Sequence, residues 1–150
     1  METFNESSLD LINQGYTLMA VENYEEAAKV FEQAVHESPR YIECYVNLGN
    51  AYASLGKYDE AIETYKKGMI LDSKNVEILF GMGKLMYLQD KLLEAIKYYN
   101  KAEETNNMTA EMYDVIADIF QANDDYVQAI RYINKAIELE PLNGNYYLEK

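Results

Sequence analysis

Apolar and small residues recur along the chain with a period of 34 residues. The unit from Ile42 to Asn75 shows this pattern most clearly, and similar residue types return one period before it and two periods after it. Its recurring positions are Tyr45, Leu48, Gly49, Tyr52, Gly56, Tyr58, Ala61, Ile62, Tyr65 and Gly68. A period of this length indicates a solenoid, in which each unit buries its apolar face by stacking on its neighbours.

Each unit is predicted to consist of two antiparallel helices. Tyr45, Leu48 and Tyr52 fall at helical spacing and mark the first helix of the clearest unit. Gly56 ends that helix, since glycine tolerates a positive φ, and Asp59 follows it where an acid suits the positive end of a second helix. The corresponding turns of the other units are expected at residues 21–23, 89–91 and 122–125. The predicted fold class is therefore all-α.

This register predicts four units and two short ends. The units cover residues 8–41, 42–75, 76–109 and 110–143, after a lead-in of residues 1–7. Residues 144–150 begin another first helix, with Tyr147 in register, and we expect a partial cap or a truncated fifth helix there. Because so short a segment covers little of the last unit, one hypothesis is self-association through this C-terminal helix. The other is that the chain is the targeting or regulatory domain of a larger protein.

Two stretches of the second unit are specific in residue type and spacing. They are Tyr45-Val46-Asn47-Leu48-Gly49-Asn50-Ala51-Tyr52 and Gly56-Lys57-Tyr58-Asp59-Glu60-Ala61-Ile62. Together with their recurrence in the other units, they resemble the tetratricopeptide repeat family over residues 8–143. The resemblance implies a right-handed superhelical solenoid whose first helices line a concave groove. It also implies a scaffold that binds an extended peptide or a partner helix there, without catalytic activity of its own.

Charge narrows the choice of partner. The chain has 13 Lys+Arg against 26 Asp+Glu, a formal net charge of −13, so it should repel nucleic acid and attract basic partners. No apolar run approaches the length of a membrane span, so membrane insertion is not expected. Residues 1–8 are polar and lack Lys and Arg, which does not fit a secretory signal. A cytoplasmic location is therefore expected.

Few residues could carry chemistry, and no catalytic, metal or cofactor site is predicted. His36 is the only histidine and is predicted to be exposed, and Cys44 is the only cysteine and is predicted to be a buried thiol without a nearby base. Asp124 and Asp125 lack the alternating spacing of a calcium loop. Residues 80–85 lack the first glycine and the hydroxyl of a phosphate-binding loop. We therefore expect a protein that is not an enzyme.

Most of the 15 tyrosines are predicted to be core residues, because they fall on recurring positions of the pattern. Tyr126 and Tyr147 belong to this set. Tyr98 and Tyr132 recur with the same period on second helices, where a packing role on the convex face is the simpler interpretation. Tyr16 and Tyr87 lie instead on the groove face of their first helices.

Helical phase predicts which side chains line the groove. The candidates are Ile12, Tyr16, Asn47, Asn50, Phe80, Lys84, Tyr87, Asp114 and Asp118. The asparagine amides could grip a peptide backbone, Phe80 and Tyr87 could hold an apolar anchor, and Gly81 would admit close approach. The predicted ligand is a neutral or basic peptide or helix with apolar anchors.

Some of these residues have a simpler structural interpretation, which stays open. Asn47 and Asn50 could serve hydrogen bonds between repeats. Glu43, Glu77 and Glu111 open their helices, where an acid is stabilising without any ligand. Relatives that clamp acidic chaperone tails carry Lys and Arg on this face. The corresponding positions here hold Ile12, Val46, Glu77, Gly81, Glu111 and Val115, so acidic tails should be repelled.

Overall fold

A computed structural model describes residues 6–140, and that range contains eight α-helices and no strand. They are α1 (Glu6–Ala20), α2 (Tyr24–Glu37), α3 (Ile42–Ser54), α4 (Tyr58–Leu71), α5 (Val76–Leu88), α6 (Leu92–Glu104), α7 (Ala110–Ala122) and α8 (Tyr126–Leu139). Odd-numbered helices are the first helices of the predicted pairs and even-numbered helices are the second. The predicted all-α class is confirmed. The expected partial helix at 144–150, with Tyr147, lies outside the described residues.

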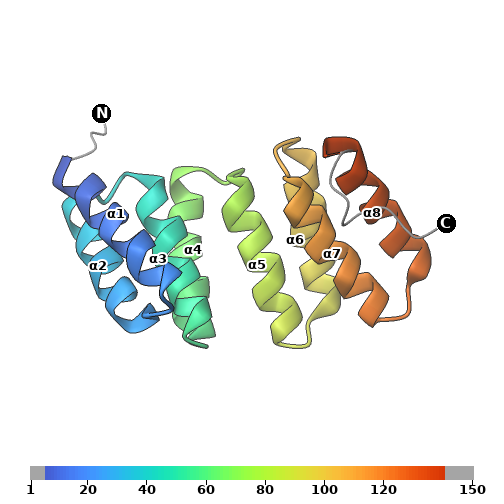
Figure 1. Ribbon diagram of the computed structural model, residues 1–150, viewed down its shortest axis with the longest axis horizontal. Helices are drawn as coiled ribbons and strands as arrows, with labels where there is room; N and C mark the ends of the chain where they lie inside the picture. Colours follow the sequence, from blue (N-terminus) through green and yellow to red (C-terminus); the bar gives the residue numbers. More distant parts are fainter. Residues whose placement is uncertain (1–5, 141–150) are drawn as a thin grey trace. The chain divides into compact units, whose positions relative to one another are not determined.

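The chain divides into two compact units, Met1–Lys101 and Ala102–Lys150. In the first unit α1 packs on α2 and α3 packs on α4, while α3 also contacts α2 and α5. Figure 1 shows α1, α3 and α5 following one another along this unit. In the second unit α7 packs on α8. First helices are therefore brought side by side in the first unit, which places their exposed side chains on a shared face.

Glycines of the first helices make room for rings of the second helices. A Cβ at Gly49 would lie 2.3 Å from Cε1 of Tyr65, and one at Gly83 would lie 2.4 Å from Cε1 of Tyr99. Both tyrosines are almost fully buried, at 2 % and 1 % exposed. The recurring pattern of small and aromatic residues is thus a packing pattern, because a close-packed interior leaves no space for a methyl group there.

Each turn inside a unit contains one residue with positive φ. The four residues, 34 apart, are Glu22 (φ 62), Gly56 (φ 76), Asp90 (φ 62) and Asp124 (φ 64). Around Gly56, the N–H of Lys57 donates to the carbonyl of Tyr52, and the same bond recurs at the other three turns. This is the Schellman arrangement, which satisfies carbonyls left free at a helix end. Only one of the four turns uses the glycine that the arrangement prefers.

Several packing predictions can be compared with the structure directly. Cys44 is fully buried and His36 is exposed, as predicted. Tyr132 is 3 % exposed, and its ring stacks on those of Tyr113 and Phe120. The prediction was wrong for Tyr126, which is 56 % exposed because it lies on the same side of α8 as the exposed Val127 and Ile130 and not on the side buried through Ala129 and Ala136.

Candidate functional site

The exposed side chains of α1, α3 and α5 form what we call the first-helix face of Met1–Lys101. On this face the hydroxyl of Tyr16 donates to Oε2 of Glu43 at 3.0 Å and accepts from Nδ2 of Asn47 at 3.3 Å. The ring of Tyr16 also meets Phe31 edge-on, with centroids 6.3 Å apart. Contacts at the hydroxyl and at the ring thus fix the orientation of Tyr16. The residue is still 44 % exposed, so a ligand can reach it.

Asn47 has a different position from the one expected. It is only 7 % exposed, and its amide is used to hold Tyr16. A buried amide in a satisfied hydrogen bond positions the aromatic ring, which is the structural interpretation that the sequence left open.

Ile12 is not part of the exposed face, which corrects the sequence assignment. It is 2 % exposed and packs against Ala34 and Cys44. Val46, one period further along, is 1 % exposed for a similar reason. Side chains at this position of the repeat are buried. A prediction from helical phase alone therefore assigns too many residues to the exposed face.

Asn50 is exposed, and its Oδ1 accepts a hydrogen bond from the hydroxyl of Tyr65. This bond uses the carbonyl oxygen and leaves the amide N–H groups of Asn50 to donate elsewhere. One period later, Lys84 occupies the position of Asn50 and Tyr99 that of Tyr65. Lysine has no acceptor, and among the described residues the buried hydroxyl of Tyr99 has no hydrogen-bond partner.

Phe80, Lys84 and Tyr87 lie together on α5. The Phe80 ring is half-buried with its centroid 5.9 Å from that of Tyr99, and Nζ of Lys84 lies 5.4 Å from the Phe80 centroid. Tyr87 is also half-buried. The structure thus brings an aromatic surface and one lysine to this end of the first-helix face.

Gly81 serves packing and does not provide room for a ligand. A Cβ at Gly81 would lie 2.8 Å from both Cζ and Oη of Tyr65. The sequence interpretation of Gly81 as a point of close approach for a peptide is therefore wrong, because the space above it is already filled.

Two carboxylates on this face interact, and sequence reasoning treated both mainly as helix-end acids. Burial, and secondly the nearby carboxylate of Glu43, raise the pKa of Glu77 above its usual value. Burial also raises the pKa of Tyr16, to which Glu43 and Glu77 contribute. The negative charges of α3 and α5 therefore act on the same small area as the Tyr16 hydroxyl. The spacing of one period between Glu43 and Glu77 was the signal that could have indicated this.

Asp114 and Asp118 lie one turn apart on α7, in the unit Ala102–Lys150. Asp114 is half-buried and Asp118 is exposed. Burial, and then the charge of Asp118, raise the pKa of Asp114 above its usual value. The structure brings this predicted pair together as a local site of unfavourable negative charge.

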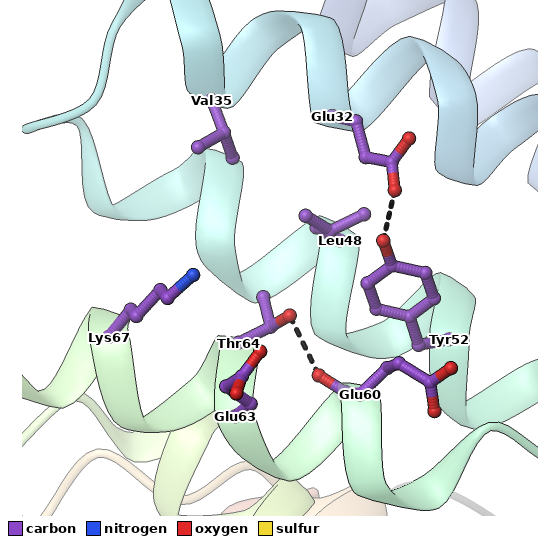
Figure 2. A pocket seen from close by; sticks show the side chains of 8 residues that line it. All are labelled: Glu32, Val35, Leu48, Tyr52, Glu60, Glu63, Thr64 and Lys67. Atoms are coloured by element: carbon purple, nitrogen blue, oxygen red, sulfur yellow. Dashed lines mark hydrogen bonds between the residues drawn. The ribbon is translucent and has the colours of Figure 1, made fainter.

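The first unit also contains a pocket that sequence reasoning missed, which we call the α2–α3–α4 pocket. It has a volume of about 240 Å³. Figure 2 shows its lining residues, which come from three helices: Glu32, Val35, Leu48, Tyr52, Glu60, Glu63, Thr64 and Lys67. The Tyr52 hydroxyl donates to Glu32, and the Thr64 hydroxyl donates to the backbone carbonyl of Glu60 at 2.8 Å (Figure 2).

Neither a metal site nor a membrane helix is found in the described part of the chain. Between residues 6 and 140, no three His, Cys, Asp or Glu side chains are grouped so that they could hold a metal ion. Within the same range, each helix is too short or too polar to cross a bilayer.

Family comparisons agree with this architecture. A model described as "Tetratricopeptide repeat" matches residues 3–69, one described as "TPR repeat" matches 49–90, and a further "Tetratricopeptide repeat" model matches 110–141. The paired helices, the small-against-aromatic packing and these matches define a helical repeat protein. The chain belongs to the tetratricopeptide repeat family. No curated protein is significantly similar to it in sequence.

Solved structures of similar fold are tetratricopeptide solenoids. A MamA crystal structure aligns with a TM-score of 0.70 and 22% identity, over 95% of this chain and 78% of MamA. The fragment "MamA 41-end" from Desulfovibrio magneticus RS-1 aligns with a TM-score of 0.72 and 17% identity, over 96% and 81% of the two chains. A thermophilic TPR protein of Thermus thermophilus aligns with a TM-score of 0.67 and 17% identity, over 93% and 94%. These similarities establish the fold, and proteins of this family are typically scaffolds without catalytic activity.

Proposed function

We propose that the chain is a non-enzymatic scaffold that binds a segment of a partner protein on the first-helix face of Met1–Lys101. The segment is extended or helical, neutral to basic, and carries apolar anchors. The observation that supports this most is the hydrogen bond from the exposed Tyr16 to the carboxylate of Glu43, together with the charge of Glu77, which acts on both groups. The negative charges select a basic side chain and the ring supplies contact area for an apolar one.

The electrostatics of the free protein favour such a ligand. The raised pKa of Glu77 reflects burial and repulsion from Glu43, which both oppose its ionisation. A cationic side chain placed between these two carboxylates would relieve the repulsion. Part of the binding free energy then comes from an unfavourable interaction that exists before the ligand arrives.

Aromatic residues of α5 extend the same surface. Phe80 and Tyr87 are half-buried and Lys84 covers part of the Phe80 ring. A mobile lysine side chain can move aside, so an apolar anchor of the ligand can replace it over Phe80. Asn50 can donate its free amide hydrogens to a peptide carbonyl.

Selection from a random peptide library displayed on phage tests the proposal with the full chain as bait. We expect selected peptides rich in Lys or Arg and in aromatic or aliphatic residues. The double variant Glu43→Gln/Glu77→Gln should bind the best of them about tenfold more weakly, the effect of about one charge-assisted contact.

A matched control variant is Glu25→Gln/Glu94→Gln, since both residues are exposed acids in the first turns of second helices. It changes the net charge equally and should leave affinity unchanged. Equal weakening in both variants would contradict a local site, and acidic selected peptides would contradict the charge preference.

The acid pair of α7 is a separate candidate contact for a basic partner, within the unit Ala102–Lys150. Reversal of both charges, Asp114→Lys/Asp118→Lys, should weaken binding of a basic partner and reduce its dependence on salt. An unchanged affinity and salt dependence would show that the α7 pair takes no part in binding.

Self-association is a second candidate function, favoured by one observation. Three neighbouring apolar residues of α8 are strongly exposed: Tyr126 (56 %), Val127 (79 %) and Ile130 (58 %). Light scattering over a range of concentrations tests it, with Ile130→Glu as the variant that should abolish association. A monomer at every concentration would contradict this candidate without affecting the peptide-binding proposal.

A further inference from the structure

The α2–α3–α4 pocket combines an apolar base with an acidic edge. Leu48 is 6 % exposed and lies at the centre of the view in Figure 2, with the ring of Tyr52 beside it. Three carboxylates line the pocket from two different helices: Glu32 of α2, and Glu60 and Glu63 of α4. The first-helix face is formed by α1, α3 and α5, and of these helices only α3 also lines the pocket. It does so through Leu48 and Tyr52, whereas Glu43 belongs to the first-helix face. The pocket is therefore distinct from the first-helix face.

We propose that this pocket is a second binding site, which takes an arginine side chain of a partner protein. The aliphatic stem of the arginine lies against Leu48 and the ring of Tyr52. Its guanidinium group lies among the carboxylates of the edge. Both parts of the side chain thus meet matching surface, since the stem is apolar and the head is cationic.

The size and arrangement of the acids favour an organic cation over a metal ion. Between residues 6 and 140 no group of carboxylates is arranged to hold a metal, so the three acids do not converge on one point. A volume of about 240 Å³ accommodates a whole side chain. A guanidinium presents five N–H donors around a plane and can reach carboxylates that stand apart, and its face can lie on an aromatic ring.

The acidic edge is not a requirement of the fold. One period later, the positions of Glu32, Glu60, Glu63 and Lys67 are occupied by Lys66, Glu94, Lys97 and Lys101. A tetratricopeptide unit therefore accepts the opposite charge at the same register positions. The negative charge gathered at this one pocket is a property of the first two units of this chain.

Lys67 also lines the pocket but, within residues 6–140, is not paired with its acids. It lies on the opposite side of the pocket from Glu32 in Figure 2, and it forms no ion pair with Glu32, Glu60 or Glu63 in the described part of the chain. The carboxylates of the pocket are therefore available to pair with the guanidinium group of a bound arginine.

Amide chemical shifts of the full chain test the proposal. The probe is a terminally blocked pentapeptide with a central arginine between two leucines, and the comparison peptides carry citrulline or lysine in its place. We expect the arginine peptide to shift the amides of Leu48, Tyr52 and Thr64 and to bind about tenfold more tightly than the citrulline peptide, which has the same shape without the charge. The variant Glu60→Gln/Glu63→Gln should lose this difference, while Glu25→Gln/Glu94→Gln should keep it.

Three results would overturn the proposal. Equal binding of the citrulline peptide would show that the carboxylates have no role. Equal binding of the lysine peptide would show that the site does not select the planar guanidinium. Shifts confined to Tyr16, Glu43 and Glu77 would assign the arginine to the first-helix face, which would leave the proposed function intact and remove this second site.

Discussion

Two tyrosines at equivalent positions, Tyr65 and Tyr99, differ in one hydrogen bond. Both rings are buried against a glycine of the preceding helix. The hydroxyl of Tyr65 donates to Asn50, while that of Tyr99 has no partner among the described residues because Lys84 replaces the asparagine. A buried hydroxyl without a partner opposes folding, whereas a bonded one is close to neutral or stabilising.

Removal of the two hydroxyls should therefore change the stability of the chain differently. We expect Tyr65→Phe to lower the free energy of unfolding by about 1 kcal/mol, and Tyr99→Phe to leave it unchanged or to raise it. Urea unfolding followed by circular dichroism measures both. A larger loss in Tyr99→Phe than in Tyr65→Phe would show that the Tyr99 hydroxyl has a partner outside the described contacts.

The sequence predicted some residues of the first-helix face correctly and others incorrectly. Tyr16, Phe80 and Tyr87 are accessible on the first-helix face. Ile12 and Gly81 were assigned to that surface from helical phase, but both are buried by neighbouring elements. Helical phase gives the direction of a side chain on its own helix. It does not tell how far the adjacent helix or a large ring reaches across it.

At the scale of elements, the turns inside the repeats depend on a left-handed conformation that glycine adopts without strain and most other residues do not. Gly56 meets the need in the second unit, whereas Glu22, Asp90 and Asp124 adopt the same positive φ with side chains attached. The sequence predicted the positions of these turns, since the period places them. It did not predict their shared conformation, because only one of them contains glycine.

The substitution Glu22→Gly should therefore stabilise the chain, by up to about 1 kcal/mol, since it removes strain of the left-handed region. Gly56→Ala should destabilise by a similar amount, even though a Cβ at Gly56 would meet nothing within 4 Å. Thermal unfolding of the two variants measures the effect. A stabilising Gly56→Ala would contradict the view that backbone conformation, and not space, selects glycine at this turn.

The stability of the folded chain should depend on pH through Glu77 of α5. Burial and the charge of Glu43 on α3 determine the direction of this dependence. The raised pKa of Glu77 means that the folded chain keeps this proton to a higher pH than the unfolded chain, whose value is near 4.5. The carboxyl therefore contributes stability below pH 4.5 that is lost as the pH rises through the raised value. A basic ligand prefers the ionised carboxyl, so binding should strengthen over the same rise in pH.

Comparison with Glu77→Gln isolates this group. We expect the stability of the original chain relative to the variant to fall as the pH rises from 4.5 toward neutral. Denaturant unfolding at a series of pH values measures the difference. A relative stability that rises over this interval would mean that Glu77 is favourably paired in the folded state, and the proposed repulsion would be wrong.

At the scale of the whole molecule, repulsion among the excess acidic residues lowers the stability of the folded chain. The formal net charge is −13, and ion pairs such as Lys29–Glu26 are exposed and contribute little. Sodium chloride should therefore raise the midpoint of thermal unfolding by screening self-repulsion. Circular dichroism at low and high salt measures it, and a fall with added salt would show that favourable ion pairs outweigh the repulsion.

The architecture of the whole chain was largely predictable, because a fixed period imposes the same helix pair on every unit and leaves the boundaries little freedom. The division into Met1–Lys101 and Ala102–Lys150 was not, since the recurring pattern gives no sign of a break within α6. The α2–α3–α4 pocket was missed for a related reason. It depends on side chains from three helices, whereas the sequence was interpreted one helix face at a time.

The proposed ligand of the first-helix face of Met1–Lys101 is a basic segment of a partner protein with apolar anchors. Amide chemical-shift mapping with the tightest peptide from the phage library tests this proposal most directly. We expect the largest shifts at Tyr16, Glu43, Glu77 and Phe80, and their loss in Glu43→Gln/Glu77→Gln. Shifts centred on α8, or unchanged binding in that double variant, would contradict the proposal.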